Sequence, residues 1–122
     1  MKNFLFKGGG LMAFLFFITL NASAQKINNV LADTTFLKAT EVTLEPGQKT
    51  DMHSHPAHFF YALTDGKLVV HYKDGKDETY DLKQGLSMAG PPERPHVTEN
   101  GGSKTLKFLI VELKDYPYKE KK

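Results

Sequence analysis

The sequence predicts an all-β protein, built as a single small barrel or sandwich. From residue 36 onward, short runs rich in β-branched and aromatic residues alternate with turn signals at regular spacing. No helical periodicity of useful length appears after residue 25. Many short strands separated by turns are typical of all-β sandwiches and barrels.

The first 24 residues are predicted to be a secretory signal peptide. Lys2 and Lys7 give a positive start, residues 11–20 form an apolar run, and Ala22-Ser23-Ala24 is a small-residue cleavage site. The apolar run is well short of the roughly 20 residues that a membrane-spanning helix needs. We therefore expect an exported protein, periplasmic or extracellular, with no stable membrane anchor after cleavage.

The composition narrows the function of the mature chain. The sequence holds 16 Lys and Arg against 14 Asp and Glu, and two of the lysines lie in the signal segment. A neutral domain without a basic stripe is a poor candidate for binding nucleic acid. The chain has no cysteine, so its stability must come from one apolar core, which a bound metal or a subunit interface could supplement.

The mature chain divides into three expected parts. Residues 25–35 are a polar lead-in that pairs weakly or wraps the barrel, residues 36–113 form the barrel, and the Lys-rich residues 114–122 are a solvated tail. Asp74-Gly75 is the clearest hairpin signal, because this pair suits the positive φ angles of a tight turn. The proline-rich residues 90–95 are expected to form an extended loop. The expected strands are 36–44, 49–55, 59–63, 67–72, 78–82, 86–89, 96–99 and 104–113.

Three histidines are candidates for one metal site. His53 and His55 are two residues apart in an extended stretch, so both imidazoles point to the same side. His96, far along the chain, is placed to add a third ligand from a neighbouring strand. Three neutral imidazoles leave an open coordination position for water or substrate. The alternative is that these are barrel residues without a metal, and the mid-strand His71 is expected to be an ordinary surface or core histidine.

The first half of the barrel resembles the first motif of the cupin family. That motif reads Gly, five residues, His-x-His, three or four residues, Glu, six residues, Gly. Gly47, His53, His55 and Gly66 match it. Phe59 stands at the Glu position, so the usual acidic ligand is absent.

The second half resembles the second cupin motif, which reads Gly, five residues, Pro-x-Gly, two residues, His, three residues, Asn. Gly85, Pro91, His96 and Asn100 match at these spacings, and Glu93 replaces the second Gly. The resemblance covers essentially all of residues 35–113.

This resemblance implies a single cupin-type β-barrel, the double-stranded β-helix or jelly roll, that commonly forms homodimers. It also implies that His53, His55 and His96 bind one divalent metal ion: Fe, Mn, Ni, Cu or Zn. A neutral three-His shell does not offset the charge of the ion, so it favours an anionic or chelating small molecule as the ligand.

Alternation from Phe59 predicts which other side chains face the site. If Phe59 points inward, then Phe59, Tyr61 and Leu63 line the interior, as an apolar wall with one phenol. They are then either plain core packing or a pocket for a largely apolar ligand. His58 then points outward or lies in the turn after Pro56, which makes it a weaker candidate for a fourth ligand. Tyr61 is the one acid or base candidate for catalysis.

Two functions from different classes fit these residues. The first is a metal-dependent enzyme of the dioxygenase type, acting on a small oxygen-bearing compound. The second is a non-catalytic module that holds a small ligand or a metal ion. The chain has no Cys, and no Ser lies in a nucleophile-elbow context, so the sequence offers no nucleophile for covalent catalysis.

Overall fold

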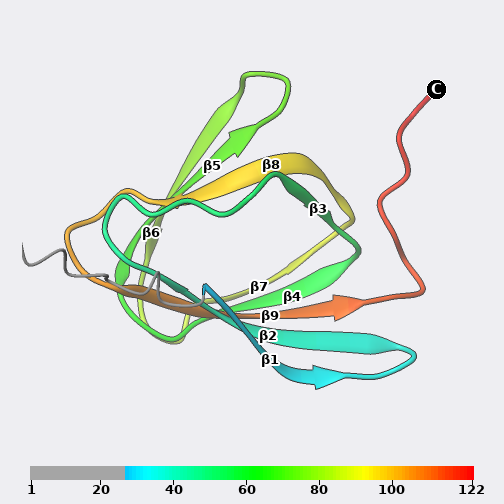
Figure 1. Cartoon of the computed structure of the whole chain (residues 1–122), viewed down its shortest axis with the longest axis horizontal. Coiled ribbons are helices and arrows are strands. Elements are labelled where there is room, and N and C mark those ends of the chain that lie inside the picture. Colours follow the sequence, from blue (N-terminus) through cyan, green and yellow to red (C-terminus); the bar gives the residue numbers. More distant parts are fainter. Residues whose placement is uncertain (1–26) are drawn as a thin grey trace, which may run out of the picture.

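The computed structural model describes residues 27–122, which form nine antiparallel strands in two sheets (Figure 1). The predicted all-β class is confirmed, and the predicted signal peptide lies outside the described residues. In the part of the chain that is described there is no helix, and so none that could cross a membrane. The strands are β1 (Asn28–Asp33), β2 (Leu37–Leu44), β3 (His53–His55), β4 (His58–Ala62), β5 (Gly66–Tyr72), β6 (Asp77–Leu82), β7 (Ser87–Gly90), β8 (Glu93–Asn100) and β9 (Leu106–Leu113).

The two sheets face each other and form the walls of a barrel (Figure 1). One has the strand order β1-β2-β9-β4-β7, and the other has the order β3-β8-β5-β6. Strands far apart in sequence are neighbours: β2 pairs with β9 in unbroken register from Leu37 opposite Leu113 to Leu44 opposite Leu106. Each sheet therefore draws on both halves of the chain, which brings the two histidine segments together.

Three segments differ from the strands expected from sequence. Residues 28–33, expected to be a lead-in, form β1 and pair with β2. Residues 49–52 meet β8 through an isolated bridge and an ion pair at Lys49 and through hydrogen bonds at Thr50, but they form no continuous ladder with it, so β3 begins at His53.

The third difference is the start of β8, which lies at Glu93 rather than His96. The pairing register of β3 with β8 shifts between His53 and His55, so this part of the ladder is irregular. Proline is tolerated at such an irregularity because no ladder hydrogen bond requires its missing N–H. The proline-rich segment thus enters the sheet earlier than its composition suggested.

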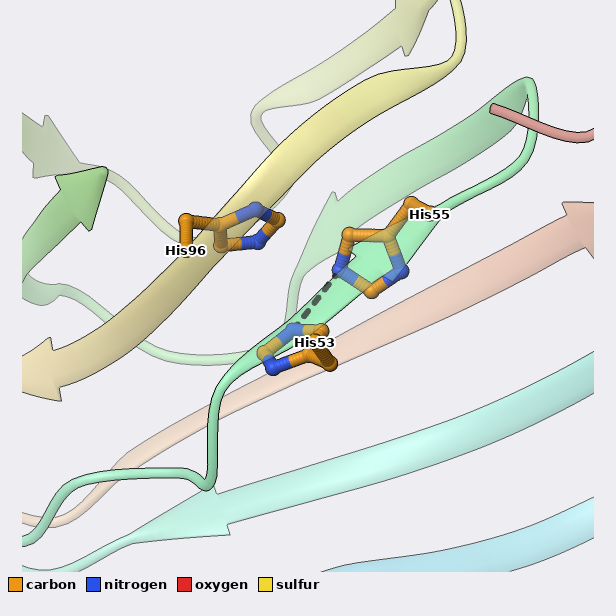
Figure 2. A group of neighbouring side chains, drawn as sticks. All are labelled: His53, His55 and His96. Atoms are coloured by element: carbon orange, nitrogen blue, oxygen red, sulfur yellow. Dashed lines mark hydrogen bonds between the residues drawn. The ribbon is translucent and has the colours of Figure 1, made fainter. Parts of the chain in front are cut away.

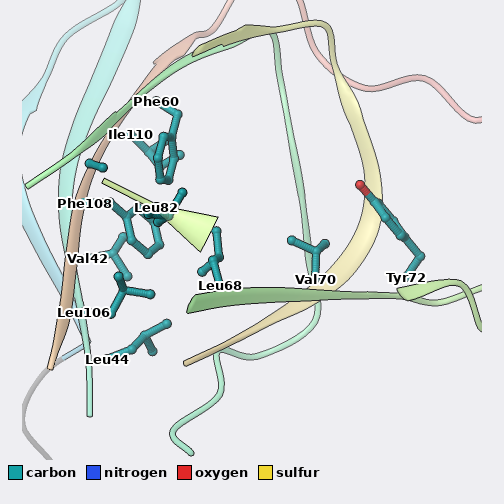
Figure 3. Close-up of a cluster of buried hydrophobic side chains, with 11 residues drawn as sticks. Val42, Leu44, Phe60, Leu68, Val70, Tyr72, Leu82, Leu106, Phe108 and Ile110 are labelled. Carbon is teal, nitrogen blue, oxygen red and sulfur yellow. The ribbon is translucent and has the colours of Figure 1, made fainter. Parts of the chain in front are cut away.

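The apolar core lies between the two sheets (Figure 3). Leu44 and Leu106 are completely buried, and the rings of Phe60 and Phe108 have centroids 5.0 Å apart. Burying one side chain of this size stabilises the fold by about 1.5–3 kcal/mol. The core residues are Val42, Leu44, Phe60, Ala62, Leu68, Val70, Tyr72, Leu82, Leu106, Phe108 and Ile110.

The first glycine of each cupin-like motif has a conformational role. Gly47 and Gly85 have φ angles of 78° and 89°, in the left-handed region that only glycine enters without strain. The Gly47 amide donates a hydrogen bond to the carbonyl of Asn100, and the Gly85 amide donates one to the carbonyl of Ala62. Each glycine therefore turns the chain and ties the turn to a strand of the barrel.

Candidate metal centre

The three predicted histidines come together inside the barrel. His53 on β3 lies directly opposite His96 on β8, and His55 points to the same side as His53 (Figure 2). One ring nitrogen from each of the three lies within 4.8 Å of the others, and the Nε2 atoms of His53 and His55 are 3.1 Å apart. Nitrogen ligands about 2.0–2.1 Å from a tetrahedral ion lie roughly 3.3 Å apart. The cluster therefore has the dimensions of a mononuclear metal site.

Backbone carbonyls fix the ring orientation of two of these histidines. The Nδ1 atom of His53 lies 2.7 Å from the carbonyl oxygen of Asp51, and that of His96 lies 2.7 Å from the carbonyl oxygen of Arg94. A carbonyl only accepts hydrogen bonds, so each Nδ1 carries the hydrogen. In the neutral ring Nε2 then presents a lone pair, the form that a metal binds.

A carboxylate does the same for the third histidine. The Nδ1 atom of His55 donates to Glu112 on β9 across 2.8 Å. This bond, opposed by burial, holds the pKa of Glu112 below its usual range. A carboxylate behind a ligating histidine fixes the tautomer and raises the basicity of the ligand nitrogen.

Burial keeps two of the histidines neutral. Loss of hydration lowers the pKa of both His53 and His96, because the charged imidazolium is disfavoured away from water. Neutral imidazole is the form that coordinates a metal. The site is therefore ready for a cation at physiological pH without first losing protons from these rings.

His58 faces this site, so the prediction that it points outward was wrong. Its ring centroid is 5.1 Å from that of His55, and its Nδ1 donates to the carbonyl of Pro56 across 2.9 Å. Its Nε2 lies 3.8 Å from Oε2 of Glu93. Opposite it stands Gly90, where a Cβ atom would lie only 3.0 Å from the His58 Nε2. The absence of a side chain at Gly90 makes room for the ring.

The prediction that Phe59, Tyr61 and Leu63 line the interior was also wrong, because the side chains of β4 alternate in the opposite phase. Phe59 and Tyr61 point outward, with 41% and 37% of their surfaces exposed, whereas Phe60 and Ala62 are buried. Leu63 follows the end of β4 and lines neither of the two cavities beside the histidines. Tyr61 therefore faces away from the site and is not placed for acid–base catalysis.

The reason for the change of phase is the break between β3 and β4. Pro56 and Ala57 lie outside both strands, with a bend at Ala57. Strict alternation does not continue through such a break, so His55 and His58 both face inward although they are three residues apart. Position 59, where the family motif has its acidic ligand, lies on the outer face of this barrel.

A cavity of about 850 Å³ borders the histidines on one side. Its polar end carries His55, His58, His96 and Glu93. Its walls are apolar and include Phe60, Leu68, Val70, Met88, Phe108 and Ile110. Residues 118–121 also line it, so this part of the predicted solvated tail lies along the cavity. A second cavity of about 570 Å³ is bordered by His53, His55 and Glu112, so the candidate centre lies between two spaces.

Two acidic residues of the site, Glu93 and Glu112, were not predicted as site residues from the sequence. Glu93 had a signal, because it departs from the second motif at a glycine position. Glu112 had none, because it lies 57 residues from His55 and meets it only through the pairing of the two sheets. His71 lies apart from the centre and bonds to Asp77 and Glu99, which agrees with its predicted role as an ordinary histidine.

Comparison with known proteins identifies the class. A family model described as the cupin domain matches residues 40–112. This match spans more than half of the chain, and the fold and the two histidine segments agree with it. The protein belongs to the cupin family.

Solved structures of other proteins, two of them described as cupins, have the same fold. A cupin domain from Bordetella pertussis Tohama I is 27% identical, with a TM-score of 0.66 over 71% of this chain and 91% of that one. An RmlC-like cupin from Methanocaldococcus jannaschii is 19% identical, with a TM-score of 0.57 over 70% and 79%. A conserved protein of unknown function from Streptococcus pyogenes is 24% identical, with a TM-score of 0.55 over 75% of each chain. No curated protein matches this sequence significantly.

Proposed function

We propose that this cupin binds one divalent metal ion through His53, His55 and His96, and a small molecule in the adjacent cavity. The observation that carries the proposal is the convergence of three Nε2 lone pairs on one point, each fixed by a bonded Nδ1–H. Three lone pairs with no shared hydrogen repel one another, and a bound cation removes that repulsion. The ion is one of Fe, Mn, Ni, Cu or Zn.

The cavity supports a particular class of small molecule. Apolar walls suit an aromatic or aliphatic body, and the polar end suits oxygen atoms that can coordinate a metal. We expect an anionic or chelating compound, such as a phenol or a diketone. The side chains of the barrel would bind and orient this compound and exclude water from it.

A dioxygenase-type reaction is the catalytic form of this proposal. A redox-active ion such as iron, when bound, would activate dioxygen and a substrate oxygen at its open positions. The other candidate is a non-catalytic ligand-binding or metal-binding module. Two observations favour that candidate: the acidic position of the first motif is occupied by Phe59, and Tyr61 faces away from the cavity.

Metal binding is tested first. Purified protein freed of metal is reconstituted with each of the five ions, and metal content and melting temperature are measured. We expect one ion per chain and a rise in melting temperature, since an ion at 100 times its Kd adds about 2.7 kcal/mol to stability. His96→Ala should abolish both effects, and His71→Ala, a change at a histidine outside the cluster, should preserve them. Failure of every ion to bind stoichiometrically would remove the proposal.

Catalysis is tested separately on the iron-loaded protein. Oxygen consumption is followed with phenolic and diketone compounds, for the wild type and for His96→Ala. Turnover that the substitution abolishes supports the enzyme. Ligand binding without oxygen consumption supports the binding module instead.

We also propose that the protein is exported and forms a homodimer. Phe59 and Tyr61 are exposed on the outer face of β4, opposite Val111 and Leu109 of β9, so they extend one apolar surface. Light scattering should report a dimer for the wild type and a monomer for Phe59→Lys. N-terminal sequencing of protein recovered outside the cytoplasm should begin at Gln25.

A further inference from the structure

The start of β8 places a carboxylate at the polar end of the cavity. Glu93 stands where the second cupin motif has glycine, and its side chain lines the cavity beside the histidines. Its Oε2 lies 4.0 Å from Nε2 of His96 and 3.8 Å from Nε2 of His58. A glycine at this position would offer no such group.

Hydrogen bonding holds the carboxylate in this orientation. Oε1 of Glu93 accepts a hydrogen bond from the hydroxyl of Tyr72 across 2.6 Å. The guanidinium of Arg94 lies 3.7 Å from the centre of the Tyr72 ring and packs against it. Among residues 27–122, no group donates a hydrogen bond to Oε2. One oxygen is therefore anchored, and the other is free and faces the histidines.

The atoms around Oε2 are all acceptors. His58 and His96 donate through Nδ1 to the carbonyls of Pro56 and Arg94, so their neutral rings present Nε2 lone pairs. A carboxylate oxygen and two such nitrogens lie close together with no hydrogen between them. The negative charge on Oε2 and the two nitrogen lone pairs repel one another. A cation bound among them removes this repulsion, as it does in the neighbouring three-His cluster.

We propose that Glu93 is the acidic ligand of this metal centre, in place of the carboxylate that position 59 lacks. The inference rests on the proposed function, because it assumes a metal at His53, His55 and His96. In an octahedral site with metal–ligand distances of about 2.1 Å, ligand atoms lie roughly 3.0 to 4.2 Å apart. The 4.0 Å between Oε2 and His96 Nε2 falls within that range, but Glu93 lies outside the group formed by His53, His55 and His96, whose ligand atoms are all within 4.8 Å of one another. The carboxylate therefore reaches the ion by a movement of the Glu93 side chain toward these three histidines. The centre then has three histidines and one carboxylate, which offsets one of the two charges of the ion.

The test is a measurement of metal affinity, which does not depend on catalytic activity. The full mature protein, freed of metal, is titrated with Co²⁺ against a competing chelator, and the visible absorption of the bound ion is recorded. Glu93→Gln keeps the shape and the Tyr72 contact but removes the charge. The matched control is Glu99→Gln, on the same strand, whose carboxylate bonds to His71 instead. Tyr72→Phe removes the hydroxyl that orients Glu93 and that also lies 3.2 Å from Oε2 of Glu78.

We expect Glu93→Gln to weaken Co²⁺ binding at least tenfold and to change its absorption spectrum. Tyr72→Phe should weaken binding by a smaller factor, and Glu99→Gln should stay within twofold of the wild type. Co²⁺ binding by Glu93→Gln within twofold of the wild type, with the same spectrum, would overturn the role of Glu93 and leave the three-His site standing. If the wild type binds no metal at all, both the three-His metal site and the role of Glu93 are overturned. That outcome differs from failure of the Glu93 proposal alone, in which the wild type still binds Co²⁺.

Discussion

Nδ1 of His55 donates a hydrogen bond to a carboxylate oxygen of Glu112 across 2.8 Å, and this bond joins the two sheets of the barrel. His55 lies on β3 in the four-stranded sheet, and Glu112 lies on β9 in the five-stranded sheet. A metal held by His55 is thereby connected to both walls. The orientation of this ligand depends on a residue that does not itself belong to the three-His cluster.

Glu112→Gln should therefore weaken metal binding without removing a ligand. An amide oxygen accepts the same hydrogen bond but lacks the charge that raises the basicity of His55, so we expect a loss of about 10–100-fold in affinity. Chelator competition on the purified variant measures it. Glu41→Gln on the neighbouring strand β2 is the control and should bind metal like the wild type. Equal affinities for the two variants would show that Glu112 does not support the centre.

Phe59→Glu restores the family's acidic residue at its expected position in sequence. Because Phe59 points outward, the new carboxylate should lie on the outer face of β4, on the opposite side of the strand from the histidines, and metal affinity should stay within twofold of the wild type. Isothermal titration with Zn²⁺ compares the two proteins. Tighter binding by the variant would mean that position 59 faces the metal after all, contrary to the strand phase described above.

The contrast between these residues shows what the sequence could and could not predict. Spacing in the two motifs was enough to predict the all-β barrel and the meeting of His53, His55 and His96, because strand alternation and family spacing agree there. Alternation failed at His58 because the bend at Ala57 changes the phase of β4. Contacts between the two sheets, such as that of Glu112, leave no local pattern in the sequence.

Asn100, the last residue of the second motif, is predicted to act on stability rather than on metal binding. It is 1% exposed; its Nδ2 donates to the carbonyls of Leu44 and Lys104, and its Oδ1 accepts from the Gly102 amide. Losing three such bonds in Asn100→Ala should cost roughly 3 kcal/mol of unfolding free energy. Urea denaturation measures this loss.

Asn28→Ala is the control for that experiment, because Asn28 is exposed on the edge strand β1. Its unfolding free energy should change by less than about 0.5 kcal/mol. The folded fraction of Asn100→Ala should still bind one metal ion per chain. A loss of less than 1 kcal/mol for Asn100→Ala would contradict a structural role for this amide.

The surface cluster around His71 should make stability depend on pH. Hydrogen bonds to Glu99 and then to Asp77 raise the pKa of His71 above its usual value, and the bond to His71 lowers the pKa of Glu99. The charged His71 therefore stabilises the fold fully below about pH 6.5, and this contribution disappears as the pH rises through the raised pKa. Glu99 needs its charge, so the contribution also fades as the pH falls below about 4.5.

The difference in melting temperature between wild type and His71→Gln should thus be largest at about pH 5–6 and small at pH 8.5 or above. The difference is the quantity to measure, because burial lowers the pKa of His53 and His96 and makes both proteins less stable as the pH falls below about 6.5. That effect is common to wild type and variant and cancels. A difference that is constant from pH 5.5 to 8.5 would show that the ion pairs of His71 do not contribute to stability.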